Sequence, residues 1–66
     1  MDTIEVWRTA QLLITQHGSR AKSAAAQRER DMFAKKNFEG AVVWRRVEVA
    51  VEELERQKPR EGEQVN

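Results

Sequence analysis

The sequence predicts an all-α fold, a compact three-helix bundle with short connections, from three observations. Apolar side chains recur at spacings of three and four residues in three segments, which is the spacing of one helix face. Glycine and asparagine interrupt the pattern between these segments. The chain has 66 residues and no cysteine, so neither disulfides nor metal–thiolate sites stabilise it. We predict one domain, residues 1–57, with helices at about 3–17, 19–36 and 41–57. A helix-turn-helix crossing is the alternative to a bundle, because the sequence indicates helix faces better than crossing angles.

The first predicted helix begins after Asp2, a favourable N-cap residue, and Glu5 three residues later completes a capping-box pattern. Gly18 is expected to end the helix, because glycine adopts a left-handed conformation at little cost. His17 then lies at the negative end of the helix dipole. The predicted apolar face consists of Ile4, Trp7, Ala10, Leu13 and Ile14.

The second predicted helix has small residues on its apolar face and Ser19 as its expected N-cap. Alanine permits close approach between helices, so we expect Met32 and Phe33 to supply most of the apolar contact. Phe38, in the following turn, is expected to anchor in the core. The apolar face consists of Ala21, Ala24, Ala25, Met32 and Phe33.

Arg28 interrupts this apolar face, and its charge needs either an acceptor or water. A helix carbonyl or a carboxylate such as Glu39 or Glu5 is one expected partner. Alternatively, Arg28 lies at the edge of the face, with a buried stem and a solvated guanidinium. A ligand-binding arginine is the functional alternative.

The third predicted helix follows a turn marked by Asn37 and Gly40, and Pro59 limits its extent. Residues 58–66 are polar and contain glycine, so we predict a flexible, disordered C-terminal tail. The apolar face consists of Val43, Trp44, Val47, Ala50, Val51 and Leu54. Four glutamates are expected mostly on the outer face: Glu48, Glu52, Glu53 and Glu55.

Trp7 and Trp44 are predicted core anchors, because each has a large apolar area in a chain with few apolar residues. An exposed tryptophan would instead indicate an interaction hot spot. Four aliphatic residues lie beside the predicted faces and are the expected interaction surface: Val6, Leu12, Val42 and Val49.

A set of positions across residues 4–54 resembles a family of small helical proteins from alphaproteobacteria, a domain of unknown function. The resemblance implies a small helical protein of the bacterial cytoplasm and assigns no activity or catalytic residue. It rests on His17, Gly18, Ala21, Ala25, Arg28, Gly40, Trp44, Val47, Ala50 and Leu54.

Two groups of polar residues are candidate contacts for anions or nucleic acid. Ser19, Arg20 and Lys22 flank the start of the second helix, where free amides favour an anion. Arg45 and Arg46 follow Trp44 and could join them on a phosphate backbone. A plain helix–helix corner at Gly18 and solvated charged faces are the alternative explanations.

The composition indicates a soluble binding protein rather than an enzyme. The 12 lysines and arginines nearly balance 11 aspartates and glutamates, whereas dedicated nucleic-acid binders usually carry a basic excess. One histidine and no cysteine leave no readable catalytic, cofactor-binding or metal site. No membrane span or signal peptide is recognisable, which favours the cytoplasm. We therefore predict a protein–protein interaction or homo-oligomerising module, with a nucleic-acid-binding or transcription-associated protein as the alternative.

Overall fold

The computed structural model describes residues 2–57, and they confirm the all-α class. Three α-helices, α1 (Thr3–His17), α2 (Ala21–Ala34) and α3 (Phe38–Arg56), are joined by a 3₁₀ turn at Gly18–Arg20 and a short loop. Because the 3₁₀ turn leads directly into α2, α1 and α2 form one continuous helical segment with a sharp bend. The predicted tail, residues 58–66, lies outside the described residues.

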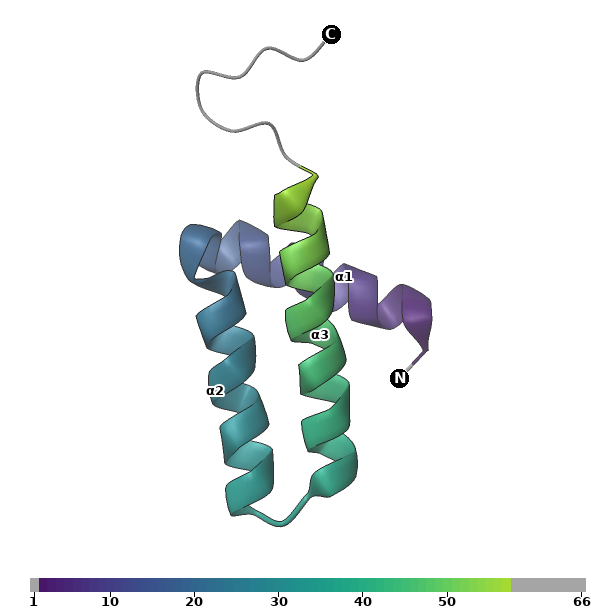
Figure 1. Cartoon of the computed structure of the whole chain (residues 1–66), viewed down its shortest axis with the longest axis vertical. Coiled ribbons are helices and arrows are strands. Elements are labelled where there is room, and N and C mark those ends of the chain that lie inside the picture. The colour runs from purple at the N-terminus through teal and green to yellow at the C-terminus, as the bar shows by residue number, and fades with distance from the viewer. Residues whose placement is uncertain (1, 58–66) are drawn as a thin grey trace, which may run out of the picture.

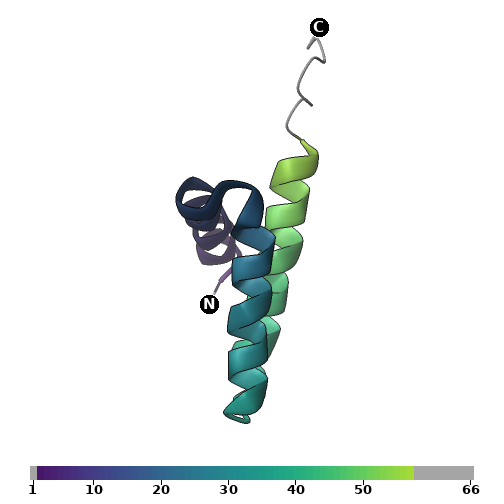
Figure 2. The same cartoon turned by 90° about the vertical axis from the view of Figure 1, so that its left-hand side faces the viewer.

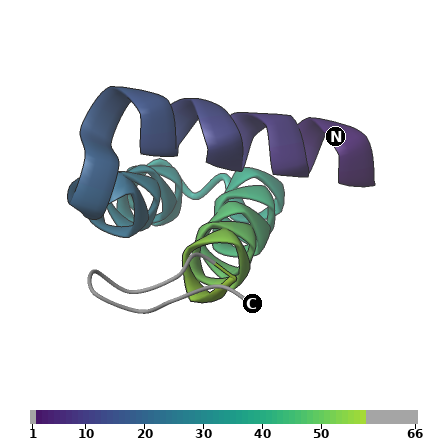
Figure 3. The same cartoon turned by 90° about the horizontal axis from the view of Figure 1, so that it is seen from above.

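The helices form an antiparallel pair with one helix across it, rather than three aligned rods. Figure 1 shows α2 and α3 side by side and antiparallel, with α1 crossing behind them at a steep angle. Figures 2 and 3 place α1 on one face of this pair, and its N-terminal end extends past α3. The structure thus confirms the all-α class and the short connections, whereas the steep crossing of α1 departs from the predicted three-helix bundle.

The bounds of α1 agree with the predicted 3–17. The Asp2 side chain accepts a hydrogen bond of 2.9 Å from the backbone N–H of Glu5, which confirms the predicted cap. Gly18 ends the helix with a positive φ of 56°, and its N–H donates to the Ile14 carbonyl. The predicted role of Gly18 is therefore correct.

The second helix is two residues shorter at each end than the predicted 19–36. Ser19 does not cap it, because Gly18–Arg20 form a 3₁₀ turn, and α2 begins at Ala21 without a side-chain cap. The helix ends at Ala34, where Lys36 has a φ of 61°. The N–H groups of Lys36 and Asn37 donate to the carbonyls of Phe33 (3.0 Å) and Met32 (2.8 Å), the pattern of a Schellman motif.

Helix α3 begins at Phe38, three residues before the predicted start at 41, because Asn37 is its N-cap. The Asn37 side-chain oxygen accepts a 2.9 Å hydrogen bond from the N–H of Gly40, which therefore lies in the first turn of α3. A Cβ on Gly40 would lie 2.7 Å from the Met32 sulfur. The glycine thus permits close contact between the ends of α2 and α3.

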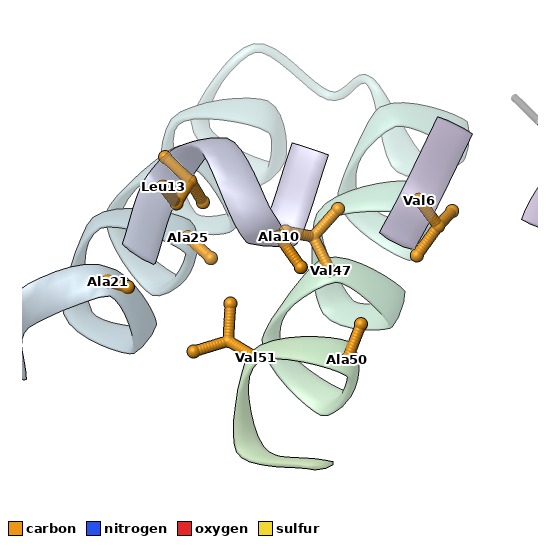
Figure 4. Packing of buried hydrophobic residues seen from close by; sticks show 8 residues of the cluster. All are labelled: Val6, Ala10, Leu13, Ala21, Ala25, Val47, Ala50 and Val51. Carbon is orange, nitrogen blue, oxygen red and sulfur yellow. The ribbon is translucent and has the colours of Figure 1, made fainter. Parts of the chain in front are cut away.

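The core is built from small and medium-sized side chains where α1 crosses the α2–α3 pair (Figure 4). Val47 and Val51 are the largest fully buried side chains, and alanines occupy most other central positions. Alanine brings the backbones close, but each one buries little apolar area. The central cluster consists of Val6, Ala10, Leu13, Ala21, Ala25, Val47, Ala50 and Val51.

Several predicted core positions lie elsewhere. Trp7 is 38% exposed, so the prediction that both tryptophans anchor the core holds only for Trp44, which is half-buried against the cluster. Phe33 and Phe38 are 52% and 59% exposed and contact each other, with ring centroids 5.9 Å apart. Val6, expected on a flank, is instead a core residue. These differences follow from the crossing of α1, which packs on the N-terminal half of α2 and the C-terminal half of α3. The Phe33–Phe38 pair lies at the opposite end of these two helices and stays uncovered.

Arg28 lies at the edge of the apolar face, as one of its two expected placements required. Its guanidinium carbon is 5.7 Å from the centroid of the Trp44 ring, and the residue is exposed. This cation–π contact leaves the charge solvated, so Arg28 does not need the carboxylate partner considered for it.

Candidate functional site

The largest apolar side chains of the described residues lie mainly outside the core. Six of the seven exposed large apolar residues are more than half exposed, whereas Ile14, Trp44 and Leu54 are half-buried against a cluster of Val, Leu and Ala. Of the four aliphatic residues predicted as an interaction surface, three are exposed by 53–54% and only Val6 is buried. The exposed large apolar residues are Ile4, Trp7, Leu12, Phe33, Phe38, Val42 and Val49.

Some of these residues line a groove between α1 and the C-terminal part of α3, here named the Trp7 groove. It has a volume of about 490 Å³ and is lined by Ile4, Trp7, Arg8, Gln11 and Leu54. Ile4, Trp7 and Gln11 share one side of α1 because they are spaced by three and four residues. That side lies next to the buried face of α1, so the crossing angle of α1 over α3 leaves it open.

A second groove, here named the arginine groove, lies between the N-terminal end of α1 and the middle of α3. It has a volume of about 620 Å³ and is lined by Asp2, Thr3, Val6, Arg45, Arg46 and Val49. It exists because α1 extends past α3, which Figure 3 shows from above. The groove combines aliphatic side chains with two arginines that are neighbours in the sequence.

Arg45 and Arg46 are exposed, and neither belongs to an ion pair among residues 2–57. The two ion pairs in that part of the chain join Lys22 to Glu52 and Arg56 to Glu53. The Lys22 ammonium lowers the pKa of the Glu52 carboxyl. Lys22 is therefore already partnered by a carboxylate from α3.

The four predicted basic contacts do not gather at one place. Arg45 and Arg46 line the arginine groove, but Arg20 and Lys22 do not. Arg20 lies with Ser19 in the exposed 3₁₀ turn next to His17 and Gly18. This part of the chain forms the helix–helix corner that was the alternative to an anion site.

Glu48 is a buried carboxyl, although the prediction placed it on the outer face of α3. It is only 5% exposed, and its Oε2 atom has no hydrogen-bond partner among residues 2–57. Burial, and then the neighbouring Glu29 carboxyl of α2, raise the pKa of Glu48 to about 7, against the weaker opposing effects of Arg45 and Lys22. The spacing did indicate that Glu48 faces the core, because position 48 follows Trp44 by four residues and precedes Val51 by three.

The described residues contain no group of three or more acidic, histidine or cysteine side chains able to hold a metal ion. Over the same part of the chain, no helix combines the length and apolar character that crossing a bilayer requires.

Comparison with known proteins adds no assignment. No family model matches the chain, and neither a curated protein nor a solved structure matches it. The resemblance to an alphaproteobacterial family stays a prediction.

Proposed function

We propose that this chain is a small bacterial, cytoplasmic interaction module that binds another protein or a second copy of itself and has no catalytic activity. In this proposal residues 1–57 act as one three-helix domain. The observation that carries it is the placement of large apolar side chains outside a core of Val, Leu and Ala.

The Trp7 groove is the proposed centre of the interface. Ile4 is 63% exposed and Trp7 is 38% exposed, and together with Leu54 they offer apolar surface on two helices. Covering a large apolar side chain contributes about 1.5–3 kcal/mol, and tryptophan is frequent among interface hot spots. A partner would therefore gain affinity there and also stabilise a fold whose own core is small.

The test compares Ile4→Asp with Leu12→Asp, two substitutions at exposed positions of α1. Ile4 lines the Trp7 groove, whereas Leu12, 54% exposed, does not. Tagged wild-type and variant proteins are used for affinity capture from the native host, with and without nuclease, and sedimentation velocity measures self-association. We expect Ile4→Asp to abolish the complex, Leu12→Asp to retain it, and nuclease to leave it intact.

Equal complex formation by both variants would place the interface elsewhere. A monomeric wild-type protein that captures no protein at near-stoichiometric amounts would contradict the proposed function itself. Circular dichroism of each variant checks that the helices persist.

Nucleic-acid binding is the second candidate, favoured by Arg45 and Arg46, which are exposed and form no ion pair with another described residue. It predicts affinity for DNA or RNA that falls steeply with salt concentration, because phosphate contacts release counterions. Loss of captured partners on nuclease treatment would support this candidate and contradict the first. The near balance of charge and the Lys22–Glu52 ion pair weigh against it.

A further inference from the structure

We propose that the arginine groove binds an acidic segment of a partner protein in which carboxylates flank an aliphatic residue. This inference rests on the proposed function, since it names the chemistry that an interaction module would recognise.

The arginine groove brings positive charge and aliphatic surface together. Val49 is 54% exposed and supplies the aliphatic surface of the groove, whereas Val6 is only 7% exposed and adds a small edge from α1. Arg45 and Arg46 stand beside Val49 on α3. An aliphatic residue of the partner would pack on Val49, and its neighbouring carboxylates would reach the guanidinium groups, which suit bidentate contacts.

The acidic groups near the two arginines have other partners or are buried. The Asp2 carboxylate accepts the N–H of Glu5 at the start of α1. Glu53, two turns beyond Arg46 on α3, is 3.3 Å from Arg56. Glu48, one turn beyond Arg45, is buried toward Glu29 of α2. Arg45 and Arg46 are therefore the cations of the groove, and neither forms an ion pair within residues 2–57.

The lining of the arginine groove suits a protein segment better than a nucleic acid. Two arginines neutralise two phosphates at most, which is few contacts for a nucleic-acid backbone. Valine side chains offer no stacking platform for bases, whereas they suit a leucine or isoleucine of a partner.

The test follows the full ¹⁵N-labelled chain by NMR during titration with two synthetic peptides. One peptide carries glutamates on both sides of a central leucine, and the other has lysines in place of the glutamates. We expect amide shifts of Thr3, Val6 and Val49 with the glutamate peptide, and binding at least about tenfold weaker with the lysine peptide.

Charge reversal supplies the matched variants. R45E/R46E is expected to lose at least about tenfold in affinity for the glutamate peptide and to prefer the lysine peptide. R30E/K35E makes the same change in net charge away from the groove, at an exposed position of α2 and at its exposed C-cap residue, and it is expected to change affinity by less than about twofold.

Three results would overturn the inference: no preference between the peptides, an equal loss in both double variants, or shifts confined to other residues. Tighter binding of a short duplex DNA than of the glutamate peptide, lost in R45E/R46E, would replace it with nucleic-acid recognition. If the groove fails these tests while Ile4→Asp still abolishes partner capture, the proposed function stands without this inference.

Discussion

Two residues in the described chain have a positive φ, and they illustrate what single positions contribute. The end of α1 at Gly18 was predicted because glycine adopts a positive φ, which other residues rarely adopt. Lys36 has the same kind of conformation at the end of α2, but a lysine gives no such indication. The sequence therefore located the first turn correctly and placed the end of the second helix too late.

Lys36→Gly is expected to stabilise the protein. At a φ of 61° lysine is strained and glycine is not, and this gain exceeds the added entropy of the unfolded chain. We expect the free energy of unfolding to rise by about 0.5–1 kcal/mol in urea denaturation. Lys35→Gly is the control, because Lys35 has an ordinary φ of −86° and should lose stability on the same change. A stability loss in Lys36→Gly would contradict the assigned turn.

Glu48→Gln is expected to remove a pH dependence of stability. Because the folded state raises the pKa of Glu48 to about 7, above its ordinary value, the unfolded state loses the proton first as pH rises. Wild-type stability from this group is complete below the unfolded pKa and declines up to about pH 7. Glu29, Arg45 and Lys22 are the charged groups acting on Glu48.

We expect Glu48→Gln to gain about 1–3 kcal/mol on wild type at pH 8, and much less at pH 4. Urea denaturation of both proteins at the two pH values measures the difference. Glu55→Gln, at an exposed position of the same helix, should show no such pH-dependent gain. An equal effect of Glu48→Gln at both pH values would mean that the carboxyl is solvated.

At the scale of the helices, the apolar spacing predicted which segments are helical, and capping residues predicted the start of α1. Caps at the other boundaries were misjudged because two explanations competed for the same residues. Asn37 suits the end of one helix and the start of the next, and the structure uses it for both the Schellman motif and the α3 cap. Gly40 was assigned to a turn, since close contact with Met32 cannot be recognised from sequence.

The alanines of α2 lead to a prediction about helix packing. Ala25 is fully buried in the core, so Ala25→Leu would insert a larger side chain where the backbones are close. We expect a loss of about 1–3 kcal/mol in the free energy of unfolding, measured by thermal or urea denaturation. Ala34→Leu, at the exposed end of the same helix, should change stability by less than about 0.5 kcal/mol. Comparable stability in both variants would contradict the close packing of α2.

At the scale of the whole molecule, the sequence did not predict how α1 crosses α2 and α3, because helix faces do not determine crossing angles. The steep crossing of α1 buries Val6, leaves Trp7 at the rim of a groove, and places Arg45 and Arg46 beside the N-terminal end of α1. The sequence indicated Trp7, Arg45 and Arg46 as candidate contact residues one by one. The two grooves that they line follow only from the way the helices cross. Helical spacing placed Trp7 in the predicted core, because Trp7, Ala10 and Leu13 follow one another at intervals of three residues.

The central claim is that another protein surface covers the Trp7 groove. The most direct test is acrylamide quenching of Trp7 fluorescence in a Trp44→Phe variant, which leaves Trp7 as the one emitting tryptophan. Quenching is compared between the dilute free protein and the protein in its captured or self-associated complex. We expect the quenching constant to fall severalfold on complex formation, while the Leu12→Asp version of the same protein shows the same fall. An unchanged quenching constant in a fully formed complex would contradict the account, because Trp7 would then remain open to solvent.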